Sequence, residues 1–185
     1  MRLKHSTIIN MEKQLNRQEI YSGKVIHVVK DEIVMDDETL AYREVVLHNG
    51  GVCIALKDSG YYYMVRQYRY ALGKEMLEFP AGKIEKGEEP DDAVVREVQE
   101  ETGFKAKNIK KFGPIIPTCG YCSERIHLYY GEAAEHVGQH FDEDESLKLE
   151  KYTFKQIKEM IKNGEIDDSK TIALMYRIEL EGLDA

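Results

Sequence analysis

The segment from Gly82 to Phe104, GKIEKGEEPDDAVVREVQEETGF, constrains the fold of this chain more than any other stretch. Pro90 suits the first turn of a helix, where its missing N–H is not needed. Two aspartates follow Pro90 and place negative charge at the positive end of the helix dipole. Gly103 supplies the left-handed residue that commonly ends a helix. These signals predict a helix from about Glu89 to Thr102.

Three glutamates of the predicted helix share one face. Glu97, Glu100 and Glu101 stand at positions i, i+3 and i+4, which neighbour one another on a helix surface. Glu88 enters from the loop before the helix. Carboxylates this close repel one another unless a cation lies between them, and Mg²⁺ and Mn²⁺ prefer such oxygen ligands. Taken alone, the spacing also allows a solvated acidic helix face.

A fixed spacing of glycines and charged residues runs through the same segment. Its letters read G-x5-E-x7-R-E-V-x-E-E-x-G-F, from Gly82 to Phe104. Every fixed position is one that the Nudix box requires, so the segment resembles the box of the Nudix hydrolases. The resemblance implies an α/β fold: a Nudix-type α/β/α sandwich with a mixed central β-sheet and an N-terminal region of antiparallel strands. It also implies an enzyme, a Nudix pyrophosphatase.

Length and charge limit the remaining possibilities. The chain has 185 residues, so we expect a single domain over 1–185, with an N-terminal arm and strands over 1–45 and a catalytic core over 46–185. A formal net charge of −8 argues against a nucleic-acid partner. No run of residues approaches a membrane span, and the N-terminus lacks an apolar signal core. We therefore expect no membrane partner and a cytoplasmic location.

The three cysteines do not suggest a disulfide framework, because their number is odd. Cys119 and Cys122 form a CxxC, but a zinc or redox site would need further ligands or a thioredoxin-like context, and neither is evident. Cys53 lies in a predicted strand and is expected in the core. We therefore expect reduced thiols without a metal.

The pattern of apolar residues and turn signals predicts strands on both sides of the helix. The predicted strands are residues 25–34, 41–47, 52–56, 61–68, 76–79, 109–116, 126–132 and 147–152. Thr153 is placed to cap a second helix that Gly164 ends, and Asp167 and Asp168 start a third that runs through Leu180. Residues up to about Arg17 are polar and allow an extended arm or a frayed helix. A mixed sheet sandwiched by helices fits this order.

Stretches outside the box are similar to the ADP-ribose and nucleoside-diphosphate-sugar pyrophosphatase branch. They are residues 42–44, 66–69, 77–82, 123–125, 142–145 and 164–168. ADP-ribose-selective members usually carry proline before a glycine where this chain has Cys119 before Gly120, so the broader class of nucleotide sugars is expected as substrate. Other Nudix reactions remain as alternatives: hydrolysis of nucleoside triphosphates or RNA caps, and isopentenyl diphosphate isomerisation. A non-catalytic nucleotide-binding module is a further alternative.

The resemblance implies roles for residues in and beside the box. Glu97 and Glu101 would be the principal ligands of Mg²⁺, for which Mn²⁺ could substitute. Glu100 would be a further or bridging ligand, and the carbonyl of Ala81 would complete the coordination. Arg96 would orient the carboxylates by ion pairing, although a purely structural role is as compatible with its position.

Residues outside the box are candidates for the remaining roles. Glu145 matches the general base of this branch, with Glu143 as the second candidate; without the resemblance, the acidic loop could be a solvated turn. Four side chains are candidate substrate contacts: Arg43, Arg69, Glu78 and Glu124. The arginines are suited to phosphate because guanidinium binds it bidentately. Members of this branch commonly form homodimers, so a second copy of the chain is the expected partner.

Overall fold

The structure, a computed structural model, describes residues 12–140 and 147–184. The chain divides into two compact units. The first unit contains the residues up to His48 together with Thr118–Ser123. The second contains Asn49–Pro117 and the residues from Glu124 onward. Within the described ranges, no helix is long and apolar enough to cross a membrane.

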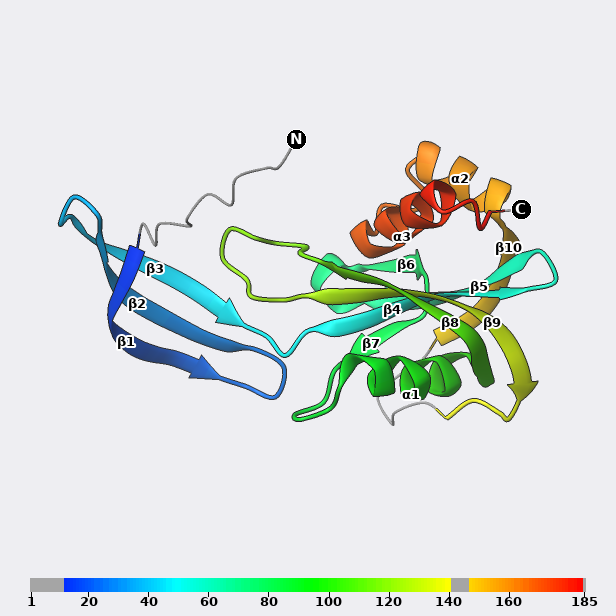
Figure 1. Ribbon diagram of the computed structural model, residues 1–185, viewed down its shortest axis with the longest axis horizontal. Helices are drawn as coiled ribbons and strands as arrows, with labels where there is room; N and C mark the ends of the chain where they lie inside the picture. The colour runs from blue at the N-terminus through cyan, green and yellow to red at the C-terminus, as the bar shows by residue number, and fades with distance from the viewer. Residues whose placement is uncertain (1–11, 141–146, 185) are drawn as a thin grey trace, which may run out of the picture. The chain divides into compact units, whose positions relative to one another are not determined.

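The N-terminal unit is built on a three-stranded antiparallel sheet, drawn in blue to cyan in Figure 1. Its strands, in spatial order, are β1 (Glu12–Ser22), β2 (His27–Met35) and β3 (Leu40–Leu47). This confirms the predicted N-terminal region of antiparallel strands. Every residue of β1 is exposed, so its sequence lacks the alternation that reveals a half-buried strand. Residues 12–17 are therefore extended, and the alternative of a frayed helix is wrong for them.

The second unit contains a seven-stranded sheet of mixed direction. Its strands are β4 (Gly51–Asp58), β5 (Tyr61–Arg69), β6 (Lys74–Glu78), β7 (Ala81–Lys83), β8 (Phe104–Ile115), β9 (Ile126–His136) and β10 (Leu147–Thr153). The order is β10-β5-β4-β9-β8, with β6 paired to β5 and β7 paired to β4. The pair β4–β9 is parallel, while the other pairs are antiparallel. A short 3₁₀ turn, η1 (Tyr70–Leu72), joins β5 to β6.

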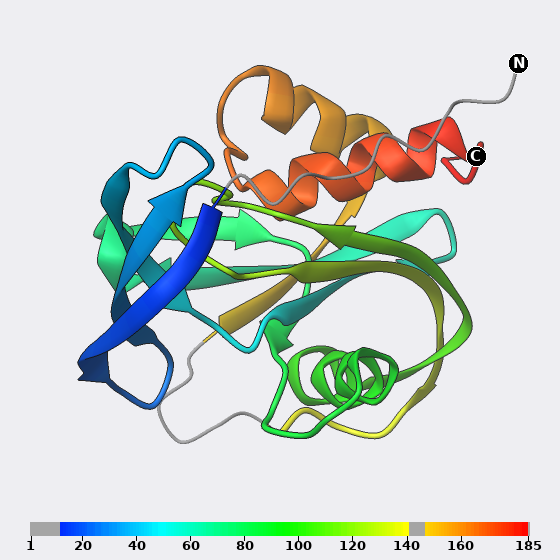
Figure 2. The ribbon, with the colours of Figure 1, turned by 60° about the vertical axis from the view of Figure 1, so that its left-hand side comes forward.

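Three helices cover the two faces of this sheet. In Figures 1 and 2, α1 (Pro90–Thr102, green) covers one face, and α2 (Phe154–Lys162) and α3 (Ser169–Leu180), orange to red, cover the other. The ends of α1 follow the sequence signals, with Pro at its start and Gly103 at φ 74° after its last turn. Thr153 and Gln156 form a reciprocal capping box at the start of α2.

The alternation of side chains along β4 divides the core of the second unit into two layers. Val52, Ile54 and Leu56 pack in the cluster that contains Val94 and Val98 of α1. Cys53 and Ala55 pack in the opposite cluster, which contains Ile157 of α2 and Leu174 and Ile178 of α3. Successive side chains of a strand point to opposite faces, so one central strand contributes to both layers. The arrangement confirms the predicted α/β/α sandwich with a mixed central sheet.

Candidate active site

The short strand β7, which precedes α1, is packed against a carboxylate of the helix. Gly82 lies beside the side chain of Glu97, and a Cβ on Gly82 would come within 1.9 Å of the Glu97 carboxyl carbon. Any side chain at this position would therefore displace the carboxylate. The first glycine of the motif is accordingly a packing requirement for the place of Glu97, rather than a requirement for an unusual backbone conformation.

The guanidinium of Arg96 holds three carboxylates together. Its Nε donates to Glu88 at 2.9 Å, and its Nη1 donates to Glu97 at 2.8 Å and to Glu100 at 2.9 Å. Its Nη2 donates to a second oxygen of Glu88 and to the carbonyl of Lys83, both at 3.0 Å. Arg96 therefore ties α1 to the loop before it and orients two of the three glutamates on its own helix.

The charges around Arg96 stabilise one another but do not balance. The hydrogen bond from Arg96 lowers the pKa of Glu88, and the same bond is the main cause that raises the pKa of Arg96 above its ordinary value. Three carboxylates surround one guanidinium, which leaves a formal charge of −2 in this cluster. A local excess of negative charge favours a cation close by.

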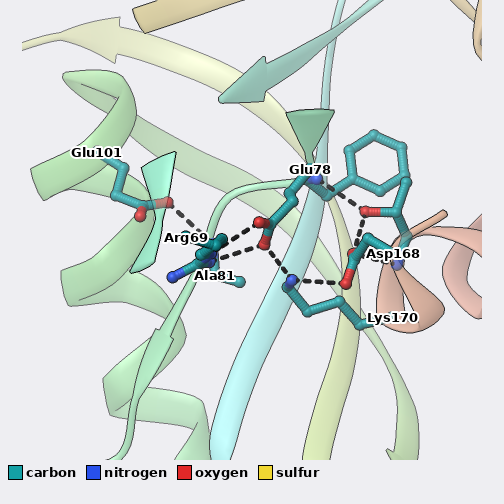
Figure 3. Close-up of polar contacts among 8 residues, drawn as sticks. Arg69, Glu78, Ala81, Glu101, Asp168 and Lys170 are labelled. Atoms are coloured by element: carbon teal, nitrogen blue, oxygen red, sulfur yellow. Dashed lines mark hydrogen bonds and ion pairs between the residues drawn. The ribbon is translucent and has the colours of Figure 1, made fainter. Parts of the chain in front are cut away.

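Glu101 binds the main chain of β7 at the residue before Gly82. The side chain is buried, with 3% of its surface exposed, and its Oε2 accepts a hydrogen bond from the N–H of Ala81 at 2.9 Å (Figure 3). Ala81 belongs to β7, which pairs with β4 at Cys53. The main chain at Ala81 is thus held beside the carboxylates of α1, as the proposed coordination would require.

The donor types of this site fit a hard divalent cation, because the carboxylates offer oxygen ligands and carry excess negative charge. Among residues 12–140 and 147–184, however, no group of three or more His, Cys, Asp or Glu side chains is already arranged around a cation site. Instead, Glu97 and Glu100 accept hydrogen bonds from Arg96, and Glu101 accepts one from the N–H of Ala81. The ligand roles therefore stay predictions.

A second group of charges lies on the β5–β6 side of the unit. Arg69 Nε and Nη2 donate to the two oxygens of Glu78, both at 2.7 Å, and Lys170 binds the same carboxylate (Figure 3). Lys170 also donates to Asp168 at 2.9 Å. Burial raises the pKa of Glu78, but the bonds from Arg69 and the charge of Lys170 outweigh it, so the pKa lies below its ordinary value.

This arrangement places Glu78 behind Arg69. Glu78 has 2% of its surface exposed, whereas 38% of the Arg69 side chain is exposed. Both carboxylate oxygens of Glu78 already bind protein cations. The carboxylate of Glu78 therefore orients the guanidinium of Arg69. A direct contact between Glu78 and the substrate stays a prediction.

Two further predicted residues, Arg43 and Glu124, lie elsewhere among the described residues. Arg43 lies in the N-terminal unit, where its Nε donates to Glu12 at 3.1 Å. Glu124 is half-buried in the second unit, just before β9. Glu143 and Glu145 lie outside the described residues. The roles of these four residues stay predictions.

The sequence analysis did not identify two buried polar residues of α3 that contact the site. Lys170, with 9% of its surface exposed, and Thr171, fully buried, were not candidates, and Asp168 was expected only at the start of a helix. A signal was present for Lys170: it precedes Leu174 and Ile178 at steps of four, so it occupies the buried stripe of α3. A lysine at such a position is an unusual core residue.

Comparison with known proteins gives consistent matches. A family model described as the NUDIX domain matches residues 47–175. The ADP-ribose pyrophosphatase of Bacillus subtilis (strain 168) is 32% identical, and a methanol dehydrogenase activator of Bacillus methanolicus is 34% identical; each match covers 92% of this chain and 94% of the relative. A solved structure of an ADP compounds hydrolase covers 96% of this chain and 98% of its own, with a TM-score of 0.84 and 18% identity. That likeness concerns the fold.

The contact between Gly82 and Glu97 predicts the effect of one added methyl group. Gly82→Ala should weaken Mn²⁺ binding by more than about 10-fold, because the Glu97 carboxylate must leave its place. The melting temperature should change little, since only the end of one side chain has to move. Calorimetric titration with Mn²⁺ and a thermal melt measure the two effects. Gly131→Ala is the control, because its Cβ would meet the end of Ile54 at 3.2 Å and the side chains of Ala106 and Ile109 at 3.6 Å, and none of these is a carboxylate of α1. Unchanged Mn²⁺ affinity in Gly82→Ala would contradict the prediction that Glu97 is a metal ligand.

The carboxylate face of α1 predicts a loss of cation binding without a loss of fold. Glu97→Gln and Glu101→Gln each remove a ligand charge but little volume, so each should lower Mn²⁺ affinity and catalytic turnover by more than about 100-fold. Asp92→Asn is a matched control, since Asp92 is an exposed carboxylate on the same helix. Near-normal turnover of both glutamine variants at low concentrations of divalent cation would show that the cation site has been misassigned.

Proposed function

Because this chain belongs to the Nudix family, we propose that it hydrolyses the diphosphate bond of nucleoside diphosphate sugars to nucleoside monophosphate and sugar phosphate. ADP-ribose and related nucleotide sugars are the proposed substrates. The observation that carries the proposal is the grouping of carboxylates on α1 beside the turn at Ala81 and Gly82. The similarity to the ADP-ribose pyrophosphatase of Bacillus subtilis, which extends over almost the whole length of this chain, supports it.

Nudix hydrolases generally depend on a divalent metal, and we propose Mg²⁺ for this enzyme, with Mn²⁺ as a substitute. Glu97 and Glu101 would be its principal ligands, with Glu100 and the carbonyl of Ala81 completing the set. A bound divalent cation screens phosphate oxygens and makes bound water more acidic. Arg96 keeps Glu97 and Glu100 oriented through its two bonds from Nη1, and the hydrogen bond from Ala81 orients Glu101.

The remaining steps need a cation for the substrate and an acceptor for a proton. Arg69 presents a guanidinium whose orientation Glu78 fixes, and we propose that it binds a substrate phosphate. In the hydrolysis, the oxygen of water bonds to one phosphorus and the bridging oxygen leaves with the other phosphate. The proton that water loses goes to a general base, for which we propose Glu145. Arg43 and Glu124 are proposed as further contacts to the nucleotide sugar.

We also propose that residues 1–185 act as a single domain in a homodimer. The N-terminal sheet leaves several large apolar side chains exposed, and a second copy of the chain would cover them. These side chains are Leu15, Ile20, Tyr21, Leu40 and Tyr42. Exposed apolar surface is one feature of sites that bind another protein chain.

A panel of substrates tests the proposed reaction and its breadth. With Mg²⁺, we expect hydrolysis of ADP-ribose and of at least one other nucleotide sugar, such as ADP-glucose or GDP-mannose, because Cys119 replaces the proline of ADP-ribose-selective members. Chromatography should detect nucleoside monophosphate and sugar phosphate in equal amounts. Nucleoside triphosphates, capped RNA and isopentenyl diphosphate serve as comparison substrates. Hydrolysis of ADP-ribose alone would disprove the breadth, and turnover of only a comparison substrate would disprove the proposed class.

Two neighbouring variants test the proposed general base. Glu145→Gln should lower kcat by about 10²–10⁴-fold, with little change in KM and with Mn²⁺ affinity close to that of the wild type, because a proton acceptor is lost while α1 is untouched. Glu143→Gln should be the milder of the two. If Glu143→Gln is the inactive variant, the base is misassigned by two residues. If neither variant is impaired, the acidic loop is not the source of the base.

A further inference from the structure

Four charged residues of alternating sign form a chain that runs from α3 to an exposed guanidinium. Asp168 binds Lys170, Lys170 binds Glu78, and Glu78 binds Arg69 (Figure 3). The inner members are almost fully buried, with exposed fractions of 9% for Lys170 and 2% for Glu78. A buried ion pair is often no more stabilising than apolar residues of the same volume. Stability alone is therefore a weak reason for a chain of charges at this place.

The inner end of the chain is rigidly attached to α3. Asp168 caps the helix: its Oδ2 accepts from the N–H of Thr171 at 2.9 Å and from the Thr171 hydroxyl at 2.6 Å. Its other oxygen, Oδ1, accepts from Lys170. The Thr171 hydroxyl in turn accepts from the N–H of Phe79 at 3.0 Å. One helix terminus thus holds both the side chain of Glu78, through Lys170, and the main chain of the next residue.

The outer end of the chain of charges is the guanidinium of Arg69, which binds Glu78 along one edge. Arg69 uses Nε and Nη2 to bind Glu78, and within the described part of the protein no acceptor binds its Nη1. The side chain is partly exposed. Its pKa is raised chiefly by the hydrogen bonds to Glu78 and further by the charge of Glu101, whose carboxylate binds the N–H of Ala81. A guanidinium held by a bidentate carboxylate has little rotational freedom left, so its remaining N–H groups point in one direction.

We propose that Lys170 and Asp168 are positioning residues for substrate binding: they fix the carboxylate of Glu78, which holds Arg69 in the orientation that binds a phosphate of the nucleotide sugar. This inference rests on the proposed function, because it takes that class of substrate as the ligand of Arg69. Lys170 offsets part of the charge of the carboxylate that it holds, and the partly exposed guanidinium of Arg69 can still bind a second anion. Neither Lys170 nor Asp168 touches the substrate.

The test compares single and double variants in the full chain. Lys170→Met should weaken ADP-ribose binding, measured by calorimetry in EDTA so that no turnover occurs, by about 10- to 100-fold, as is typical for residues that orient a ligating group. With Mg²⁺, KM should rise by a similar factor, while kcat and Mn²⁺ affinity stay close to wild-type values. Lys74→Met is the matched control, because Lys74 is an exposed lysine paired to the neighbouring Asp167 at 2.6 Å. It should bind ADP-ribose like the wild type.

A charge-balanced variant separates positioning from stability. Glu78→Gln/Lys170→Met removes one buried charge of each sign, so its denaturation midpoint should recover relative to Lys170→Met. Its affinity for ADP-ribose should stay low, because Arg69 has lost its carboxylate. Recovery of both stability and affinity in the double variant would overturn the inference, as would unchanged affinity in Lys170→Met. If the wild type and the variants bind ADP-ribose equally well, the inference is wrong while the proposed function stands. If the wild type neither binds nor hydrolyses any nucleotide sugar, both the proposed function and the inference are wrong.

Discussion

The site of this protein depends on how crowded carboxylates on α1 are kept in place. Glu97 and Glu100 share the Nη1 of Arg96, and Glu101 is held instead by a main-chain N–H at Ala81. Without these donors, side chains one helical turn apart would repel one another and disperse into solvent. The single guanidinium restrains the group but leaves it net negative, which keeps it attractive to a cation.

Both helical layers bind the same short segment, which runs from the end of β6 to the first residue of β7. From one layer, α1 binds the N–H of Ala81; from the other, Thr171 of α3 binds the N–H of Phe79. Between them, the carbonyl of Pro80 accepts from the N–H of Ile54 in β4 at 2.9 Å. The segment therefore has little freedom to move against either layer. Groups on rigid elements are held more accurately than groups on free loops, which suits a site that must place phosphate oxygens.

The sequence predicts well what local signals determine. The ends of α1 follow from Pro90 and Gly103, and the carboxylate face follows from helical spacing, because both depend only on residues within a few turns. Arg69 and Glu78 are not opposite each other in the β5–β6 register, in which Val65 lies opposite Glu78 and Arg69 lies opposite Lys74. Their pairing therefore depends on how the two side chains extend across the sheet, which the sequence does not show. The pairing of Glu78 with Lys170 joins residues 92 apart, and no local pattern encodes it. β1 escaped prediction because it buries neither face.

The distribution of charge offers a physical account of how an acidic protein could hold a diphosphate. With a net charge of −8, the chain as a whole repels anions, so attraction must come from fixed local groups that act at short range. The structure offers two kinds of group: the carboxylates of α1, which favour a divalent cation, and the guanidinium of Arg69, which Glu78 holds in place. A diphosphate carries negative charge on two phosphorus centres and can engage both. Because Lys170 also pairs with Glu78, the charge of the carboxylate that orients Arg69 is shared between two cations rather than directed at the guanidinium alone.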